Sequence, residues 1–167
     1  DSGVEFVGYD MLDTYSHIVK YRTITDKKGD RFQLVLDRTP FYAESGGQIG
    51  DTGWLKTDSE QIRVLDTKKE NDLIVHFVEK LPQHPEAQFF AVVDREKRQL
   101  TMNNHTATHL LQSALKSVLG EHIQQRGSLV NEQLLRFDFS HFGKMTEEEI
   151  AKVEAIVNAK VRENISL

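Results

Sequence analysis

Two histidines lie four residues apart in the run His105-Thr106-Ala107-Thr108-His109. In an α-helix, residues i and i+4 share a face, so both imidazole rings can reach one metal ion. Zinc takes three or four protein ligands from cysteine, histidine and carboxylate side chains, and this chain has no cysteine. The pair therefore predicts half of a zinc site, with exposed or helix-capping histidines as the alternative. Thr106 stands where a zinc protease needs a glutamate base, which argues against a metalloprotease.

A glycine-rich run occupies residues 41–53, with four glycines within eight residues. Such glycines imply positive φ angles or close backbone approach, and the hydroxyl, carboxylate and amide groups of the run could line a ligand site. The run lacks the strand, glycine loop, lysine and helix order of a phosphate-binding loop. A tight loop that joins two strands is the simpler interpretation. Glu44 and Gln48 are the candidate binding residues of the run.

Gln125 follows the histidine segment, where a bend at Gly120 would return the chain toward the metal. A glutamine amide beside a metal-bound substrate can donate to a carbonyl oxygen and accept from an attacking water, although such residues are often simply exposed. Asp138 and His141 are weaker candidates for completing the metal shell. The other histidines have no ligand spacing and are predicted to be structural or exposed: His17, His76, His84 and His122.

The elements that position these residues fall into two segments. Short apolar runs separated by polar turns fill residues 1–93, at 18–24, 32–36, 54–55, 62–65, 73–78 and 88–93. Their spacing predicts a small β-barrel rather than βαβ units, and the turn at residues 26–30 predicts a hairpin. The polar run at residues 68–72 is expected to separate the strand at residues 62–65 from the strand at residues 73–78.

After residue 93 the apolar period becomes helical. Asp94 is a predicted N-cap, and Gly120 stands where the following helix is expected to end. The apolar stripe of that helix is predicted at Leu100, Ala107, Leu111, Ala114, Leu115 and Val118. Residues 134–139 read as a strand. Thr146 begins a capping box for a second helix, whose apolar side is expected at Ile150, Val153, Ile156, Val157 and Val161. The fold class is therefore α+β, with domains at 1–93 and 94–167.

Composition indicates an ordinary soluble protein. The chain has 167 residues, 38% of them hydrophobic, and a net charge of −5. It contains neither a membrane-spanning run nor a signal peptide, so a cytoplasmic location and no membrane partner are expected. Charge is uneven: residues 1–94 carry 11 basic and 17 acidic side chains, and residues 95–167 carry 10 and 9. The local basic excess around the histidine pair includes Arg126 and Arg136 and favours an anionic ligand, or merely solvates the surface.

Several blocks together resemble the editing region of the alanyl-tRNA synthetase family. They are residues 39–53, 105–111, 127–130 and 135–141, in the family's order. The resemblance covers essentially the whole chain. It implies a β-barrel of the translation-factor type, followed by the N-terminal part of the α+β editing domain shared by threonyl- and alanyl-tRNA synthetases.

This resemblance also implies a function for the parent protein. The parent would attach alanine to tRNA(Ala) using ATP and Mg²⁺, and would hydrolyse mischarged Ser-tRNA(Ala) and Gly-tRNA(Ala). His105 and His109 match zinc ligands of the family, and Gln125 matches a glutamine beside the editing site. Thr106 and Thr108 are candidates for contacting the serine hydroxyl, or else they bond back to helix carbonyls. The candidates for contact with the substrate and the tRNA acceptor end are Glu44, Gln48, Arg126 and Arg136.

The family's remaining zinc ligands lie in a Cys-x-x-x-His segment, which this sequence lacks. We therefore expect a fragment with an incomplete zinc site and weak zinc binding. The fragment would have no aminoacylation domain and no activity of its own, and its exposed surface could promote self-association. Two other functions compete with this interpretation. One is a free-standing hydrolase of mischarged tRNA, and the other is a non-catalytic tRNA-binding module.

Overall fold

A computed structural model describes residues 4–163 of the chain. These residues divide into two compact units. The first contains residues 4–45 and 49–98, and the second contains residues 99–163 together with residues 46–48 of the glycine-rich run. No helix of the described residues combines the length and the apolar character needed to cross a bilayer.

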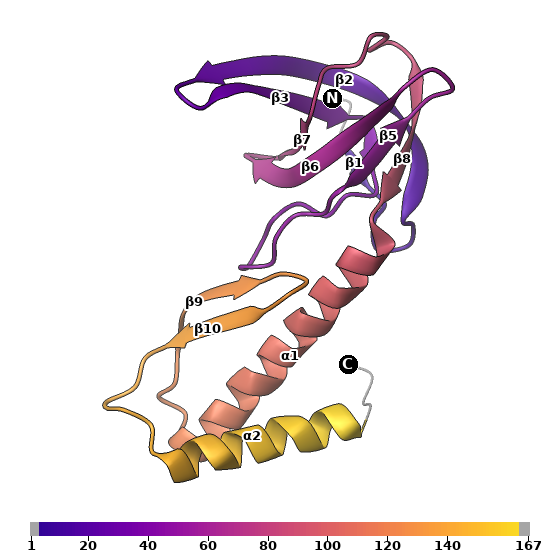
Figure 1. Ribbon diagram of the computed structural model, residues 1–167. Coiled ribbons are helices and arrows are strands. Elements are labelled where there is room, and N and C mark those ends of the chain that lie inside the picture. The colour runs from indigo at the N-terminus through magenta and orange to yellow at the C-terminus, as the bar shows by residue number, and fades with distance from the viewer. Residues whose placement is uncertain (1–3, 164–167) are drawn as a thin grey trace. The chain divides into compact units, whose positions relative to one another are not determined.

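The first unit is a closed antiparallel barrel of six strands, which confirms the barrel predicted from the spacing of apolar runs (Figure 1). Around the barrel the strands follow the order β2 (Asp13–Asp26), β3 (Gly29–Leu36), β7 (Leu73–Val78), β6 (Gln61–Glu70), β5 (Gly53–Lys56) and β8 (Gln88–Val93). Two short strands that the sequence did not predict, β1 (Glu5–Phe6) and β4 (Arg38–Thr39), pair in parallel beside it.

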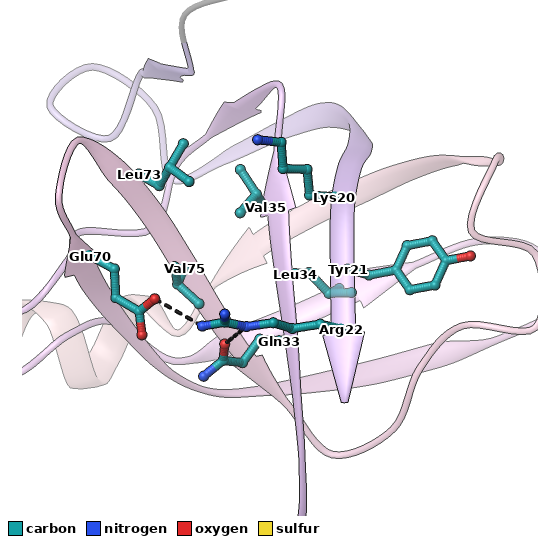
Figure 2. A pocket seen from close by; sticks show the side chains of 9 residues that line it. All are labelled: Lys20, Tyr21, Arg22, Gln33, Leu34, Val35, Glu70, Leu73 and Val75. Carbon is teal, nitrogen blue, oxygen red and sulfur yellow. Dashed lines mark hydrogen bonds and ion pairs between the residues drawn. The ribbon is translucent and has the colours of Figure 1, made fainter. Parts of the chain in front are cut away.

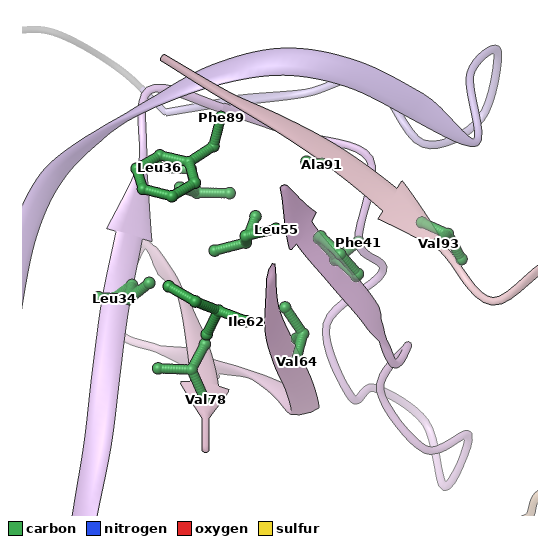
Figure 3. Close-up of a cluster of buried hydrophobic side chains, with 10 residues drawn as sticks. All are labelled: Leu34, Leu36, Phe41, Leu55, Ile62, Val64, Val78, Phe89, Ala91 and Val93. Atoms are coloured by element: carbon green, nitrogen blue, oxygen red, sulfur yellow. The ribbon is translucent and has the colours of Figure 1, made fainter. Parts of the chain in front are cut away.

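Ten buried apolar side chains fill the barrel (Figure 3). They come from five of its strands and from the segment after β4, because inward-facing residues alternate along each strand. Leu34 and Leu36 of β3, and Ile62 and Val64 of β6, are examples. This core gives the unit its own source of stability.

The predicted hairpin is present between β2 and β3, where Asp26 pairs with Gly29 and Gly29 has a φ of +107°. The predicted break at residues 68–72 is partly wrong. Lys68 continues β6 and pairs with Val75, and only a tight turn at Asn71, with φ +54°, separates β6 from β7. An antiparallel hairpin with one face in solvent accommodates polar residues on its strands. A run of polar residues is therefore not sufficient to predict the end of a strand.

The second unit consists of two helices and two strands. The helices are α1 (Arg95–Leu119), which begins in the barrel unit, and α2 (Glu147–Arg162). The strands are β9 (Gln125–Val130), which the sequence did not predict, and β10 (Leu135–Phe139), which it did.

The predicted helix ends are confirmed. The Asp94 carboxylate accepts from the Lys97 N–H at 3.1 Å, and Gly120 has a φ of +117°. Thr146 and Glu149 form the reciprocal hydrogen bonds of a capping box.

The core of the second unit is small. Its buried members are Ala114, Leu115, Ile123 and Val153, with Phe137 and Phe139 among the side chains packed against them. Three residues of the predicted apolar stripes are instead exposed: Leu100, Ile150 and Val161. The helical period is therefore correct, but the apolar stripes extend beyond the surface that is packed in this unit.

Candidate metal centre

The first turn of α1 is held by a buried ion pair within the barrel unit. The Arg98 guanidinium donates through Nε to Asp51 Oδ2 at 2.9 Å, and its two terminal nitrogens reach the carbonyl oxygens of Gly8 and Pro40 at 2.6 and 2.8 Å. Burial raises the pKa of the Asp51 carboxyl, and the hydrogen bond and charge of Arg98 oppose that rise. These contacts hold the first turn of α1 to the segments that contain Gly8, Pro40 and Asp51.

His105 and His109 converge on the same face of α1. Their Nε2 atoms lie 3.1 Å apart, and the rings meet edge to face with centroids 4.8 Å apart. Two Zn–N bonds at a tetrahedral angle separate their nitrogens by about 3.3 Å. The spacing of the two Nε2 atoms therefore fits a pair of adjacent positions in a zinc shell.

The protonation of His105 also suits a metal ligand. Burial lowers the pKa of its imidazole, and a positive charge on His109 would lower it further. Nδ1 of His105 is buried and has no hydrogen-bond partner among residues 4–163. A ring kept neutral presents a free lone pair, which is the form that binds a cation.

The described residues do not complete a metal shell around this pair. Within residues 4–163, no group of three or more histidine, aspartate or glutamate side chains is placed to hold an ion. The two weaker candidates are engaged elsewhere: Asp138 pairs with Arg136 at 3.2 Å, and His141 Nδ1 lies 2.9 Å from His122 Nε2.

The two threonines between the histidines differ. Thr108 is buried and donates back to the Asn104 carbonyl at 2.8 Å, which is the local bond considered as the alternative to substrate contact. Thr106 is exposed. Of the two hydroxyls, only that of Thr106 faces solvent.

Gln125 opens strand β9 and is exposed, with its amide donating to Ser128 Oγ at 3.0 Å. Ser128 Oγ in turn donates to the Gly46 carbonyl at 3.2 Å. An amide held by one bond to a hydroxyl keeps its carbonyl oxygen and a second N–H available for a ligand.

The glycine-rich run does more than join two strands, which corrects the simpler interpretation of it. Its residues 46–48 lie along β9, where Gln48 forms a parallel bridge with Val130 and the Val130 N–H donates to the Gly47 carbonyl at 2.9 Å. Gly47 has a φ of +84°, and a Cβ on it would lie 2.1 Å from Ser128 Oγ. Close backbone approach is therefore the reason for glycine here.

The remaining candidates lie in different places. Glu44 belongs to the barrel unit and pairs with Lys68 at 3.7 Å, whereas Gln48 is buried in the second unit. Arg126 on β9 and Arg136 on β10 are both exposed. The second unit thus contains the histidine pair, Gln125 and both arginines.

A second histidine pair was not predicted. His122 and His141 stack with centroids 5.2 Å apart, and His122 also stacks on Phe142 at 4.6 Å. The two histidines are 19 residues apart, on the loop after α1 and the loop before α2. Because no helical or strand period links them, spacing in the sequence carries no signal for this pair.

The barrel has a surface groove of about 480 Å³ (Figure 2). Its floor includes Leu34, Val35 and Val75, and Arg22 crosses one side, donating to Gln33 Oε1 at 2.6 Å and to Glu70 Oε2 at 3.0 Å. The charge of Arg22 is matched by Glu70, and much of the remaining lining is apolar.

The chain belongs to the family of class II (A) tRNA synthetases, whose sequence pattern matches residues 2–97. Within that class its similarity is to alanine–tRNA ligases, which confirms the family that the sequence resembles. It is 61% identical to the alanine–tRNA ligase of Cytophaga hutchinsonii over the whole chain, 60% to that of Bacteroides thetaiotaomicron over 98% of the chain, and 54% to that of Christiangramia forsetii over 97%. In each case the chain spans about a fifth of the relative's length, 19%.

Proposed function

We propose that this chain is the part of an alanine–tRNA ligase that carries two ligands of a zinc-dependent editing site. The observation that carries the proposal is the convergence of His105 and His109, whose Nε2 atoms lie 3.1 Å apart. The high identity to proteins named alanine–tRNA ligase supports the choice of family. The reaction proposed for the whole protein's editing site is hydrolysis of Ser-tRNA(Ala) and Gly-tRNA(Ala).

A second, hydrolytic site is useful to an enzyme that selects alanine. A pocket that fits alanine admits the smaller glycine, and it rejects serine poorly because one added hydroxyl costs little discrimination. Hydrolysis of the wrong ester then supplies the accuracy that binding alone does not. Attachment of alanine itself, with ATP and Mg²⁺, is assigned to a domain outside this chain.

Two histidines provide only part of a zinc shell, so we assign the remaining ligands to protein segments outside residues 4–163. Zinc held there would supply Lewis-acid chemistry, polarising the ester carbonyl or activating a water. The Gln125 amide is assigned to orient the ester, because its carbonyl oxygen and one N–H are available. Thr106 is assigned to the serine hydroxyl, since the Thr108 hydroxyl is already engaged with Asn104.

The acceptor end of tRNA(Ala) is the proposed macromolecular partner. Residues 95–136 carry six basic and three acidic side chains in a protein of net charge −5. Exposed Arg126 and Arg136 are proposed to contact the phosphate backbone, since cationic side chains that neutralise phosphates release bound counterions and so favour binding. The six-stranded barrel and the second unit are proposed to correspond to a translation-factor-type barrel and to part of the editing domain shared with threonyl-tRNA synthetases.

The decisive experiment compares this chain with a longer form that extends through the next cysteine-containing segment of its gene. Release of serine from Ser-tRNA(Ala) and zinc affinity are measured for both. We expect the longer form to hydrolyse the ester and to bind zinc tightly, and the chain alone to do neither. Equal activity of the two forms would show that the account of a divided site is wrong.

His109→Ala in the longer form tests the ligand assignment. We expect the rate of serine release to fall by at least ~100-fold, since even partners of metal ligands contribute roughly 10–100-fold. His84→Ala is the matched control, because His84 is an exposed residue of the barrel unit whose imidazole lies 3.4 Å from the Glu86 carboxylate. If His109→Ala retains the activity of the control, the histidine pair is not part of the site.

A further inference from the structure

A β-bulge brings the side chains of Gln125 and Ser128 to the same face of strand β9. Side chains alternate along a regular strand, so residues three apart point to opposite faces. The register of β9 against β10 shifts between Asp138 and Phe139, which gives β9 one extra residue at Arg126. An extra residue interrupts the alternation and re-aims the side chain beyond it. The two side chains can therefore meet, and they form a hydrogen bond.

The Ser128 hydroxyl joins two groups, and its hydrogen bonds have a defined direction. Its oxygen accepts from the Gln125 amide at 3.0 Å, and its hydrogen is donated to the Gly46 carbonyl at 3.2 Å. A hydroxyl has a single hydrogen to donate, and a backbone carbonyl can only accept. Because that hydrogen is engaged with Gly46, Ser128 can only accept from Gln125. The NH₂ end of the amide, and not its carbonyl oxygen, therefore faces Ser128.

The glycine-rich run holds the Gly46 carbonyl beside β9. The Val130 N–H donates to the Gly47 carbonyl at 2.9 Å, and Gln48 forms a parallel bridge with Val130. Gly46 and Gly47 have φ angles of +58° and +84°, a conformation that residues with side chains rarely adopt. A Cβ on Gly47 would overlap the Ser128 hydroxyl. The two glycines thus bring a backbone acceptor to Ser128 and leave room for its hydroxyl.

We propose that Ser128 is a positioning residue, which fixes the orientation of the Gln125 amide for ester hydrolysis. This role rests on the proposed function, in which Gln125 orients the mischarged ester. An amide that turns over exchanges its donor and acceptor ends, so its orientation decides which group meets the substrate. With the NH₂ end held at Ser128, the carbonyl oxygen is directed away from Ser128 and can accept from an attacking water. The acceptor at Gly46 thus sets the orientation of the amide through the Ser128 hydroxyl.

Single-turnover release of serine from Ser-tRNA(Ala) tests this role, in the longer form that extends through the next cysteine-containing segment. Ser128→Ala removes the hydroxyl and should lower the rate roughly 3- to 10-fold, the effect of one hydrogen bond, with little change in affinity for the tRNA. Ser128→Thr keeps a hydroxyl and should retain most of the rate. Ser140→Ala is the matched control, because the Ser140 hydroxyl bonds to the Gln124 carbonyl at 3.5 Å and not to the Gln125 amide.

A double-mutant cycle separates positioning from a general loss of structure. Ser128→Ala should have no further effect in a Gln125→Ala protein, because the hydroxyl acts only through the amide. An equal reduction in both backgrounds would overturn the proposal. If Gln125→Ala is impaired but Ser128→Ala is as active as the control, only the role of Ser128 is wrong. If Gln125→Ala keeps the full rate, the proposed function of Gln125 is wrong, and the role of Ser128 fails with it.

Nuclear magnetic resonance of the Gln125 side-chain NH₂ group gives a readout that does not depend on activity, and it uses this chain. We expect the NH₂ signals to show restricted motion in the unmodified chain and in Ser128→Thr. In Ser128→Ala they should show the motion of a free glutamine side chain, since the acceptor is gone. If the NH₂ group is as mobile before the substitution as after it, Ser128 does not hold the amide, and the proposal is wrong whatever the rates.

Discussion

His76 shows how a single buried residue makes the barrel sensitive to acid. Its Nε2 lies 2.7 Å from Thr39 Oγ1 and its Nδ1 lies 3.2 Å from the Leu34 carbonyl. Burial lowers the pKa of the imidazole to about 4, from 6.5 in an exposed histidine. The unfolded chain therefore takes up the proton first as pH falls. The stability from a neutral His76 is complete above pH 6.5 and is lost as pH approaches 4.

We predict that the free energy of unfolding of the barrel falls by on the order of 3 kcal/mol over this range through His76. Urea unfolding followed by the fluorescence of Trp54, the single tryptophan and a β5 residue, measures it. His76→Gln keeps a hydrogen-bonding group without a titration in this range and should lose most of the pH dependence. His84→Gln, at an exposed site, should retain it. If the unfolding free energy of His76→Gln depends on pH as strongly as that of the unmodified chain, His76 is not the source of the acid sensitivity.

The histidines show which contacts of a site can be predicted from the sequence. His105 and His109 converge because the helix alone fixes the relation between i and i+4, so their spacing was sufficient. His122 and His141 meet through two loops, and His76 depends on strands that pair across the barrel. Those contacts are set by the tertiary structure, and residue spacing does not encode them.

At the scale of elements, the Arg98–Asp51 pair determines how α1 begins. Arg98 donates to the Asp51 carboxylate and to two backbone carbonyls in a buried setting. Removing one partner of a buried pair leaves an uncompensated charge. We predict that Arg98→Met lowers the free energy of unfolding of the barrel by about 3–5 kcal/mol at neutral pH. The loss should be smaller in acid, where the Asp51 carboxyl takes up a proton.

Arg95→Met is the matched control for this prediction. Arg95 lies in the same helical turn and pairs with Asp13 at 3.1 Å, but its side chain is 66% exposed. Exposed ion pairs contribute roughly 0–1 kcal/mol, so this variant should unfold at nearly the urea concentration of the unmodified chain. If both variants lose the same free energy of unfolding, burial of the Arg98–Asp51 pair does not increase its contribution to stability, and the prediction is wrong.

Elements were predicted well where their own residues define them. The capped helices and the alternating strands of the barrel have local signals, and they were found. Strand β9, with Gly127 and polar neighbours, has no alternating apolar pattern, and the sequence did not predict it. It is a strand because β10 pairs along one edge and residues 46–48 lie along the other. β10 follows β9 directly in the sequence, but residues 46–48 lie far from it, and their pairing with β9 is visible only in the structure.

At the scale of the whole molecule, the two units differ in how much core they contain. The barrel has a cluster of ten buried apolar residues, and the second unit has four. The helix period and the strand alternation identify most members of both cores, but not Phe41 and Ile123, which lie outside the helices and strands. They did not show that residues 46–48, far from the second unit in sequence, belong to it. A segment of three residues has no pattern of its own, and its place depends on close contact between Gly47 and Ser128.

This difference predicts that the second unit unfolds before the barrel. Burial of apolar surface is the main source of stability, and regions with few buried contacts open at lower free energy. In urea, amide exchange of β9, β10 and α2 should rise at a lower concentration than the Trp54 transition. Leu115→Ala and Leu55→Ala are a matched pair, since both leucines are at most 2% exposed. Each substitution should cost about 2–5 kcal/mol in its own unit. If each variant shifts both transitions equally, the chain unfolds as one cooperative body, and the smaller core is not the weaker part.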